Sequence, residues 1–150
     1  MERNEIIKEL KKYFSIEELV CDHTLAKHGE ASWQFLDTDF LHCLLILRRD
    51  ILGRPMKCNN HKLEMHQRGL RCNRCQIVRD KSNAYLSAHV LGKGADFTVE
   101  GMTAQQARQR IKLLPNAFPC QVRIEGDVTW LHFDVMPQWG ISSKVHEFIA

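Results

Sequence analysis

The chain contains 150 residues, of which 44% are hydrophobic, and it has a formal net charge of +3. This length supports one hydrophobic core but not two, so we expect a single domain over residues 1–150. No apolar run reaches the roughly 18 residues of a membrane span, and the charged N-terminus is unlike a signal peptide. We therefore expect synthesis in the cytoplasm and no membrane anchor. The small positive charge fits an anionic substrate surface but does not by itself indicate nucleic-acid binding.

The first half of the chain carries mainly helix signals. Ser15 and Glu18 form a capping box, which predicts a short helix that begins there. Residues 37–52 place leucine and isoleucine near helical spacing and are followed by Gly53, so they predict the main core helix. Residues 56–60 then predict a short strand.

The second half of the chain mixes strand and helix signals. Residues 95–99 predict a strand, and residues 103–114 predict a helix with a second capping box and a proline directly after it. Residues 121–125 and 129–135 flank a Gly-Asp pair, which is typical of a turn. These two segments are therefore expected to form a β-hairpin.

Alternation along the second hairpin strand separates a polar face from an apolar one, because successive side chains in a strand point to opposite sides. Trp130, His132 and Asp134 share one face, which is expected to line a cleft. We expect Asp96, in the strand predicted over residues 95–99, to face the same cleft. The other face of the hairpin strand is expected to pack on the helices and carries Leu131, Phe133 and Val135.

Three side chains form a candidate catalytic metal set, namely His89, Asp96 and His132. Two imidazoles and one carboxylate provide three protein ligands and leave the fourth tetrahedral position of a zinc ion open for water. Hydrolysis requires that open position. Ligand types alone also fit Fe(II), although the long separation between His89 and Asp96 favours zinc. Ser87, two residues before the first histidine, is expected to support a ligand through its hydroxyl.

Amide hydrolysis also needs a base, for which Glu125 is the candidate. A hairpin turn of two or four residues places Glu125 on the face of His132, whereas a turn of three residues places it opposite. Asp127 is the second candidate, but its place in the turn favours a solvated turn former. Arg71 offers a bidentate cation for an oxyanion or a substrate carboxylate. The simpler alternatives are an exposed strand carboxylate at Glu125 and a solvated arginine at Arg71.

The polar segment 57–86, rich in Arg, Asn and Cys, predicts a long functional loop. Six cysteines in a chain without export signals indicate reduced thiols or metal ligands rather than disulfides. Four residues of this segment have the spacing of a closed structural zinc site. These residues are Cys58, His61, Cys72 and Cys75. Such a site would hold Arg71 in place. The alternative is that the cysteines are partly buried thiols and the histidine lies on the surface.

The pattern Ser87-x-His89-x2-Gly92-x-Gly94-Ala95-Asp96, followed by Trp130-x-His132-x-Asp134, resembles the zinc D-alanyl-D-alanine carboxypeptidases and L-alanyl-D-glutamate endopeptidases. The hedgehog signalling domain shares the fold of this family. The resemblance covers about residues 55–136 and includes the segment Arg68-Gly69-Leu70-Arg71. It implies an α+β fold with a small antiparallel sheet and helices packed on one face.

The resemblance also implies roles for individual residues. His89, Asp96 and His132 would be zinc ligands, and Arg71 would polarise the scissile carbonyl. Many members carry the base three residues before the second histidine, where this chain has Thr129. In other members the base lies on the preceding strand, which corresponds to Glu125.

Members of this family cleave stem peptides of bacterial peptidoglycan, so the resemblance implies a zinc metallopeptidase with that substrate. A small member without a signal peptide resembles a bacteriophage endolysin, which acts on the cell wall when released. We expect a monomer that does not bind nucleic acid. A catalytically silent zinc module that binds a partner is the main alternative. A further alternative is nucleic-acid binding through the Cys/Arg-rich segment, which predicts a strongly salt-dependent affinity.

Overall fold

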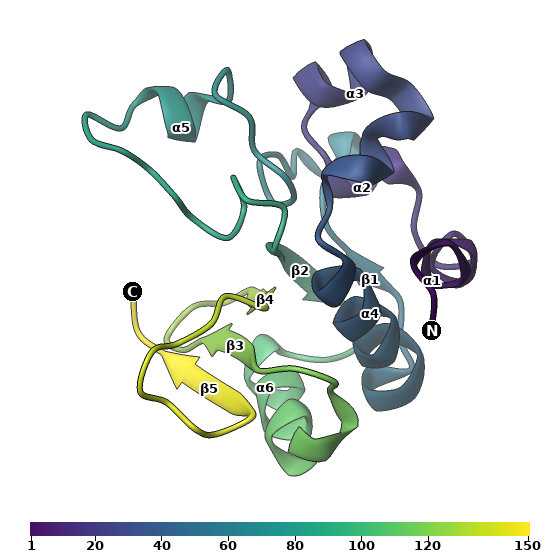
Figure 1. The fold of residues 1–150 in the computed structure, drawn as a ribbon, viewed down its shortest axis with the longest axis vertical. Helices are drawn as coiled ribbons and strands as arrows, with labels where there is room; N and C mark the ends of the chain where they lie inside the picture. Colours follow the sequence, from purple (N-terminus) through teal and green to yellow (C-terminus); the bar gives the residue numbers. More distant parts are fainter.

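A computed structural model describes residues 1–150, and at its centre lies a five-stranded sheet in the order β1-β2-β4-β3-β5 (Figure 1). The neighbouring pairs β1/β2, β2/β4 and β3/β4 are antiparallel, whereas β3 and β5 are parallel. The strands are β1 (Met56–Lys57), β2 (Gly94–Val99), β3 (Val122–Glu125), β4 (Leu131–Asp134) and β5 (Val145–Phe148). The expected α+β class is thus confirmed, but the sheet is mixed.

The prediction of a purely antiparallel sheet is wrong because of the last strand. The chain reverses direction after β4, so β5 runs opposite to β4. Both sides of β4 are already occupied, by β2 and by β3. The returning strand therefore pairs with the free edge of β3, which runs in the same direction.

Helices make up most of the first half of the chain and also connect β2 to β3. The predicted helix over residues 37–52 is present as α4 followed by the π-helical segment η2, and the predicted strand over 56–60 is reduced to β1. The helical elements are α1 (Arg3–Leu10), α2 (Ile16–Leu19), α3 (Asp22–His28), η1 (Gly29–Phe35), α4 (Thr38–Ile46), η2 (Leu47–Leu52), η3 (His61–Leu63), α5 (Gln76–Arg79), α6 (Ala104–Leu113) and η4 (Pro115–Ala117). None of these helices is long and apolar enough to cross a membrane.

The helix ends follow the signals in the sequence. Ser15 and Thr103 are the N-caps of α2 and α6, each with a reciprocal capping box. Asp37 caps α4 by accepting a hydrogen bond from the Phe40 N–H at 3.1 Å. Gly53 ends η2 with a φ of 62°, a left-handed conformation that glycine adopts without strain.

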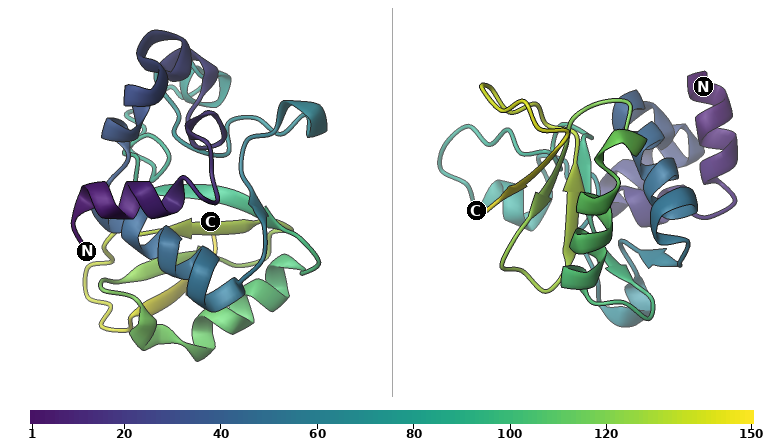
Figure 2. Two further views of the ribbon diagram at one scale, coloured as in Figure 1. Left: turned by 90° about the vertical axis from the view of Figure 1, so that its right-hand side faces the viewer. Right: turned by 90° about the horizontal axis from the view of Figure 1, so that it is seen from below.

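The core lies between the sheet and the helices α4 and α6, which both lie on one side of the sheet in Figure 2. The apolar face of the hairpin is buried there, as expected from the alternation. Its fully buried side chains include Leu131, Phe133 and Ile124, and Phe97 of β2 joins them. The opposite face of the sheet is therefore free for polar side chains.

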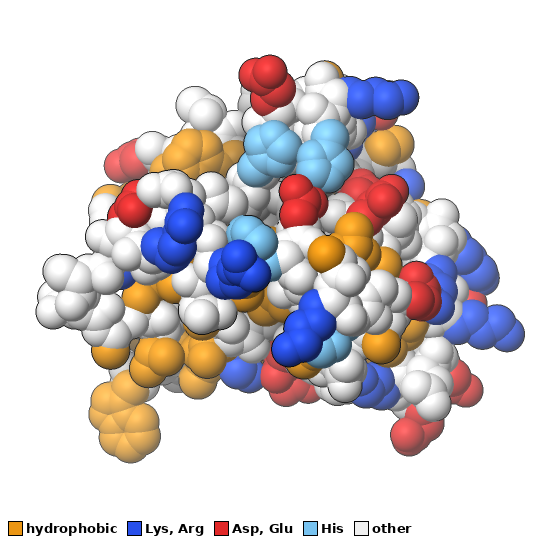
Figure 3. Space-filling view, turned by 90° about the horizontal axis from the view of Figure 1, so that it is seen from above, with side chains coloured by type: hydrophobic (Ala, Val, Ile, Leu, Met, Phe, Trp, Pro, Cys, Tyr) orange, Lys and Arg blue, Asp and Glu red, His pale blue; other side chains and the backbone are white.

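The segment 57–86 lies away from α6 and contains little regular structure beyond η3 and α5 (Figure 1). It borders α3 at the end of the molecule that Figure 3 views from above, where histidine, arginine and acidic side chains gather. His23, His61 and His66 line one pocket of about 300 Å³ in this region. Most of the segment is exposed, so core burial contributes little to its stability.

Candidate metal centre

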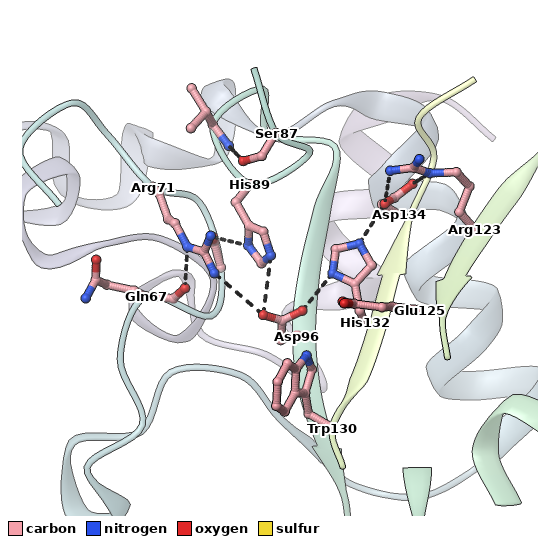
Figure 4. A network of polar contacts seen from close by, with 12 residues as sticks. Gln67, Arg71, Ser87, His89, Asp96, Arg123, Glu125, Trp130, His132 and Asp134 are labelled. Atoms are coloured by element: carbon pink, nitrogen blue, oxygen red, sulfur yellow. Dashed lines mark hydrogen bonds and ion pairs between the residues drawn. The ribbon is translucent and has the colours of Figure 1, made fainter. Parts of the chain in front are cut away.

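His89, Asp96 and His132 converge on the polar face of the sheet (Figure 4). Asp96 in β2 and His132 in β4 are directly opposed in the antiparallel register, which places both side chains on the same face. The Asp96 carboxylate lies 2.7 Å from His132 Nδ1 and 3.3 Å from His89 Nε2. The three donor atoms all lie within 4.8 Å of one another. The structure therefore brings together the three candidate ligands that the sequence proposed.

His89 is oriented by the backbone of the arginine segment. Its Nδ1–H donates to the Gly69 carbonyl oxygen at 2.9 Å, which leaves Nε2 facing Asp96. A Cβ at Gly69 would lie 2.3 Å from the Leu19 carbonyl oxygen, so the close approach of these two backbones requires glycine. The Ser87 hydroxyl accepts from the Val90 N–H at 3.4 Å and thus supports the turn that carries His89, without contacting a ligand atom.

A second carboxylate holds Nε2 of His132, the ring nitrogen that points away from Asp96 and is called its outer nitrogen below. His132 Nε2 lies 2.6 Å from Asp134, which is completely buried. Arg123 donates two hydrogen bonds of 2.8 Å to the two oxygens of Asp134. Such a carboxylate fixes the tautomer and the ring orientation of a metal-binding histidine. Arg123 was not predicted as part of the site, although alternation along its strand places it on the same face as Glu125. Its pairing with Asp134 follows from the observed register.

Electrostatics within this cluster favour charged groups. Burial alone would raise the pKa of the Asp96 carboxyl, but hydrogen bonds from His132 and His89 outweigh it and hold that pKa far below its ordinary value. Burial alone would lower the pKa of His132, whereas hydrogen bonds to Asp134 and Asp96 raise it to about 9. A metal ion that binds His132 Nδ1 therefore displaces a proton from this ring, so metal binding is expected to weaken at acidic pH.

Arg71 lies directly beside the cluster. Its Nη2 is 3.7 Å from the Asp96 carboxylate, its Nε donates to the Gln67 carbonyl oxygen at 2.6 Å, and its Nη1 donates to the Tyr85 hydroxyl at 3.3 Å. A cavity of about 380 Å³ opens over Arg71 and Asp96, and Trp130, which is 39% exposed, forms part of its wall. The guanidinium is thus fixed at the edge of a space that reaches Asp96, one of the three candidate ligands.

Glu125 lies at the end of β3. Arg123 and Ile124 pair with Asp134 and Phe133, so one further step of this register places Glu125 opposite His132 and on the same face. Figure 4 draws the two side chains next to each other. The hydrogen bond that Glu125 accepts, from Arg108, involves its backbone oxygen and not its carboxylate. Asp127 is exposed in the turn with a φ of 57°, and on geometry it is the weaker candidate.

The second cluster differs from the one proposed from the sequence. Cys58 is completely buried in the core, where burial raises the pKa of its thiol, and His61 is exposed, 3.3 Å from Asp22. Neither joins Cys72 and Cys75, so the set Cys58, His61, Cys72 and Cys75 is wrong. The residues that share this cluster are Cys21, His23, Cys72 and Cys75.

The correct cysteine partners come from a distant part of the chain. Leu70 N–H donates to the Leu19 carbonyl oxygen at 2.8 Å, and Val20 forms a parallel bridge with Leu70. This pairing brings residues 72–75 beside residues 21–23. The spacing Cys21-x-His23 was the only local signal, and it gives no indication of the partners about fifty residues away.

Comparison of the chain with protein-family models, curated proteins and solved structures finds no match. The donor sets themselves therefore carry the chemical argument. Two imidazole nitrogens and one carboxylate, all buried and with the carboxylate in the wall of an open cavity, suit a divalent metal that must keep one position free. Three thiols and one imidazole suit a closed site.

Proposed function

We propose that this protein is a zinc-dependent peptidase that cleaves a peptide bond in the stem peptide of bacterial peptidoglycan. The supporting observation is the convergence of His89 Nε2, the Asp96 carboxylate and His132 Nδ1, with Asp134 on the outer nitrogen of His132. Ordinary hydrogen-bonding networks also bring such groups together, but here one of them, Asp96, borders a cavity that is also lined by the fixed Arg71. That combination favours hydrolysis over a structural role.

The donor set fits zinc, and His89, Asp96 and His132 would be its ligands. A zinc ion held there supplies an activated water and polarises a carbonyl group. Glu125, on the same face as His132, would take the proton of the attacking water and later deliver it to the leaving amine. Arg71 would donate to the carbonyl oxygen as negative charge develops on it, or to a substrate carboxylate nearby.

The substrate class is inferred from the motif resemblance and from two arginines in the cavity wall. Arg71 and Arg68 both line it, and a stem peptide presents free carboxylates that these guanidinium groups can bind. We propose the hedgehog-type fold of the D-Ala-D-Ala carboxypeptidase and L-Ala-D-Glu endopeptidase family, and a role like that of a phage endolysin that reaches the wall after release. The scissile bond would adjoin a D-residue.

A catalytically silent zinc module of the same fold is the second candidate. The favouring observation is that Thr129 stands where many family members carry the base. A protein of this kind would bind zinc at His89, Asp96 and His132 and recognise a partner through the cavity, without turnover.

Digestion of purified peptidoglycan, followed by mass spectrometry of the released fragments, tests the proposal. The wild-type protein should produce fragments whose masses identify one stem-peptide bond, and chelation should stop cleavage until zinc is restored. Cleavage that continues after complete removal of metal would refute the metal-dependent mechanism. Stoichiometric zinc at the His/Asp cluster without turnover on any wall fragment would favour the silent module.

A further inference from the structure

The Cys21/His23/Cys72/Cys75 cluster lies outside the proposed catalytic centre and joins two regions of the chain. Cys21 precedes α3 and His23 lies in its first turn, whereas Cys72 and Cys75 precede α5 in the segment 57–86. Cys21 and Cys75 are buried, Cys72 is half-buried and His23 is exposed. The cluster is therefore largely shielded from solvent but reachable from one side.

The distances in this cluster match the edges of a zinc tetrahedron. Zinc bonds of about 2.3 Å to sulfur and about 2.1 Å to nitrogen give edges of about 3.8 Å between two sulfurs and about 3.6 Å between sulfur and nitrogen. His23 Nδ1 lies 3.6 Å from Cys72 Sγ and 3.8 Å from Cys75 Sγ, and the two sulfurs are 4.0 Å apart. All four donor atoms, with that of Cys21, lie within 4.8 Å of one another.

A disulfide does not explain this arrangement. The sulfurs of Cys72 and Cys75 are 4.0 Å apart, about twice the length of a disulfide bond, and every cysteine of the chain is free. A Cys72–Cys75 disulfide would also leave the thiol of Cys21 and the imidazole of His23 without a role in the cluster. A shared metal ion uses all four groups at once.

The segment 57–86 is fixed by a few backbone hydrogen bonds but by little apolar burial. Leu70 is its only large apolar side chain among those that are buried, and the rest of the segment is mostly polar and exposed. Arg71 directly precedes Cys72, and its backbone N–H donates to the His89 carbonyl oxygen at 3.1 Å. Arg71 is the residue that approaches Asp96. A metal bond at Cys72 therefore restrains the backbone directly after Arg71.

We propose that Cys21, His23, Cys72 and Cys75 bind one zinc ion in a closed structural site that fastens the segment 57–86 to α3. The ion replaces the missing apolar core of this segment, as metal binding does in small metal-dependent domains. It also keeps Arg71 at the edge of the cavity. The site stands whether or not the His/Asp cluster is catalytic, because the two share no residue.

Cobalt substitution tests the site without any measurement of activity. Co²⁺ added to the metal-free, reduced protein should give the strong sulfur-to-cobalt charge-transfer absorption of a thiolate site, which His89, Asp96 and His132 cannot produce. His23→Ala should weaken cobalt binding at the thiolate site at least about tenfold. His61→Ala is the matched control, since it removes another exposed histidine of the same pocket and should leave the spectrum unchanged.

Zinc counting and proteolysis complete the test. The wild type should hold about two zinc ions per chain, and either Cys72→Ala or His132→Ala should reduce this to about one. Chelation should speed cleavage of residues 76–86 in limited proteolysis, because the segment is then less restrained, and added zinc should slow this cleavage again. Absence of the thiolate absorption, or an unchanged zinc count in both His23→Ala and Cys72→Ala, would overturn the site. A Cys72–Cys75 disulfide in protein without zinc would instead identify a redox dithiol.

Discussion

The His/Asp cluster and the Cys/His cluster are built in opposite ways. In the first, Asp96 and His132 come from adjacent paired strands, and their side chains face each other because of the strand register. In the second, Cys21 and Cys72 come from irregular segments that meet through a few backbone hydrogen bonds. A sheet keeps its ligands in place without metal, whereas short loops need the ion to hold theirs. The first arrangement suits catalysis, and the second suits a structural site that holds two loops together.

Loss of a ligand should therefore have different consequences in the two clusters. His132→Ala should abolish peptidoglycan cleavage, a larger effect than the roughly 10²–10⁴-fold that loss of a general base costs. Cys72→Ala should leave measurable cleavage, because all three candidate ligands of the His/Asp cluster remain. Rates of fragment release compare the two variants directly. Equal and complete loss in both, with folded protein in each case, would contradict this division of roles.

Removal of the proposed base separates chemistry from metal binding. Glu125→Gln should lower kcat by about 10²–10⁴-fold while the zinc content stays at the wild-type value. Glu100→Gln, an exposed carboxylate that follows β2, is the matched control and should behave as the wild type. The same measurement on Asp127→Asn distinguishes the two candidate bases. A loss of activity in Asp127→Asn but not in Glu125→Gln would reverse the assignment.

The support behind His132 should affect metal affinity more than folding of the sheet. Asp134→Asn keeps an acceptor for His132 Nε2 but removes the charge that Arg123 pairs with, and zinc affinity at the His/Asp cluster should fall about 10–100-fold. Competition with a chelator of known affinity measures this change. Asp80→Asn changes an exposed carboxylate directly after α5 and should leave the zinc affinity of the His/Asp cluster unchanged. Unchanged affinity in Asp134→Asn would show that the outer carboxylate has no such role.

The smallest effect is expected at Asp37, which links the core helix to the turn before β2. Burial alone would raise the pKa of its carboxyl, but hydrogen bonds from Lys93 and the Phe40 N–H outweigh it and lower that pKa. A carboxyl with a lowered folded pKa stabilises the protein above its ordinary pKa, and this contribution is lost as the pH falls through the folded value. Asp37→Ala should therefore cost about 0.5–2 kcal/mol of unfolding free energy at neutral pH.

Urea denaturation of Asp37→Ala and the wild type at pH 7 and near pH 3 checks the sign of this effect. The difference between the two proteins should shrink at the lower pH, where the wild-type carboxyl begins to protonate. Asp39→Ala, two residues further along on the same helix, is the matched control and should cost less at both pH values. A difference that grows on acidification would contradict the role assigned to the Lys93 contact.

Local patterns in the sequence predicted the elements that carry the His/Asp cluster. Alternation over residues 129–135 and the capping box of α6 correctly gave the hairpin and the helix, and Gly53 marked the end of the core helix. Strand β5 was missed because Val145–Phe148 is only half-buried and its parallel pairing joins it to the edge of β3. Helix α1 was also missed, although Ile6 and Leu10 lie four residues apart on its buried side.

The same contrast explains the result for the two clusters. Asp96 and His132 lie in strands, so alternation could predict that both face one cleft, whereas His89 lies in the turn before β2 and was proposed from its residue type and motif. Cys58 has a sequence spacing that suits metal binding, but its side chain is buried in the core. Sequence spacing alone does not reveal that burial. Partners such as Cys21 become visible only when the backbone pairing of Val20 with Leu70 is known.

The final strand adds a condition for recognising related proteins. The Phe148 ring of β5 stands nearly perpendicular to the His132 ring, 5.8 Å away, and also lies under Arg123, 4.4 Å from its guanidinium carbon. A sequence that ends before Val145 would retain every candidate ligand residue yet lose this aromatic wall beside His132. Candidate relatives should therefore be judged by whether they carry a closing aromatic strand, and not by the histidine and aspartate signature alone.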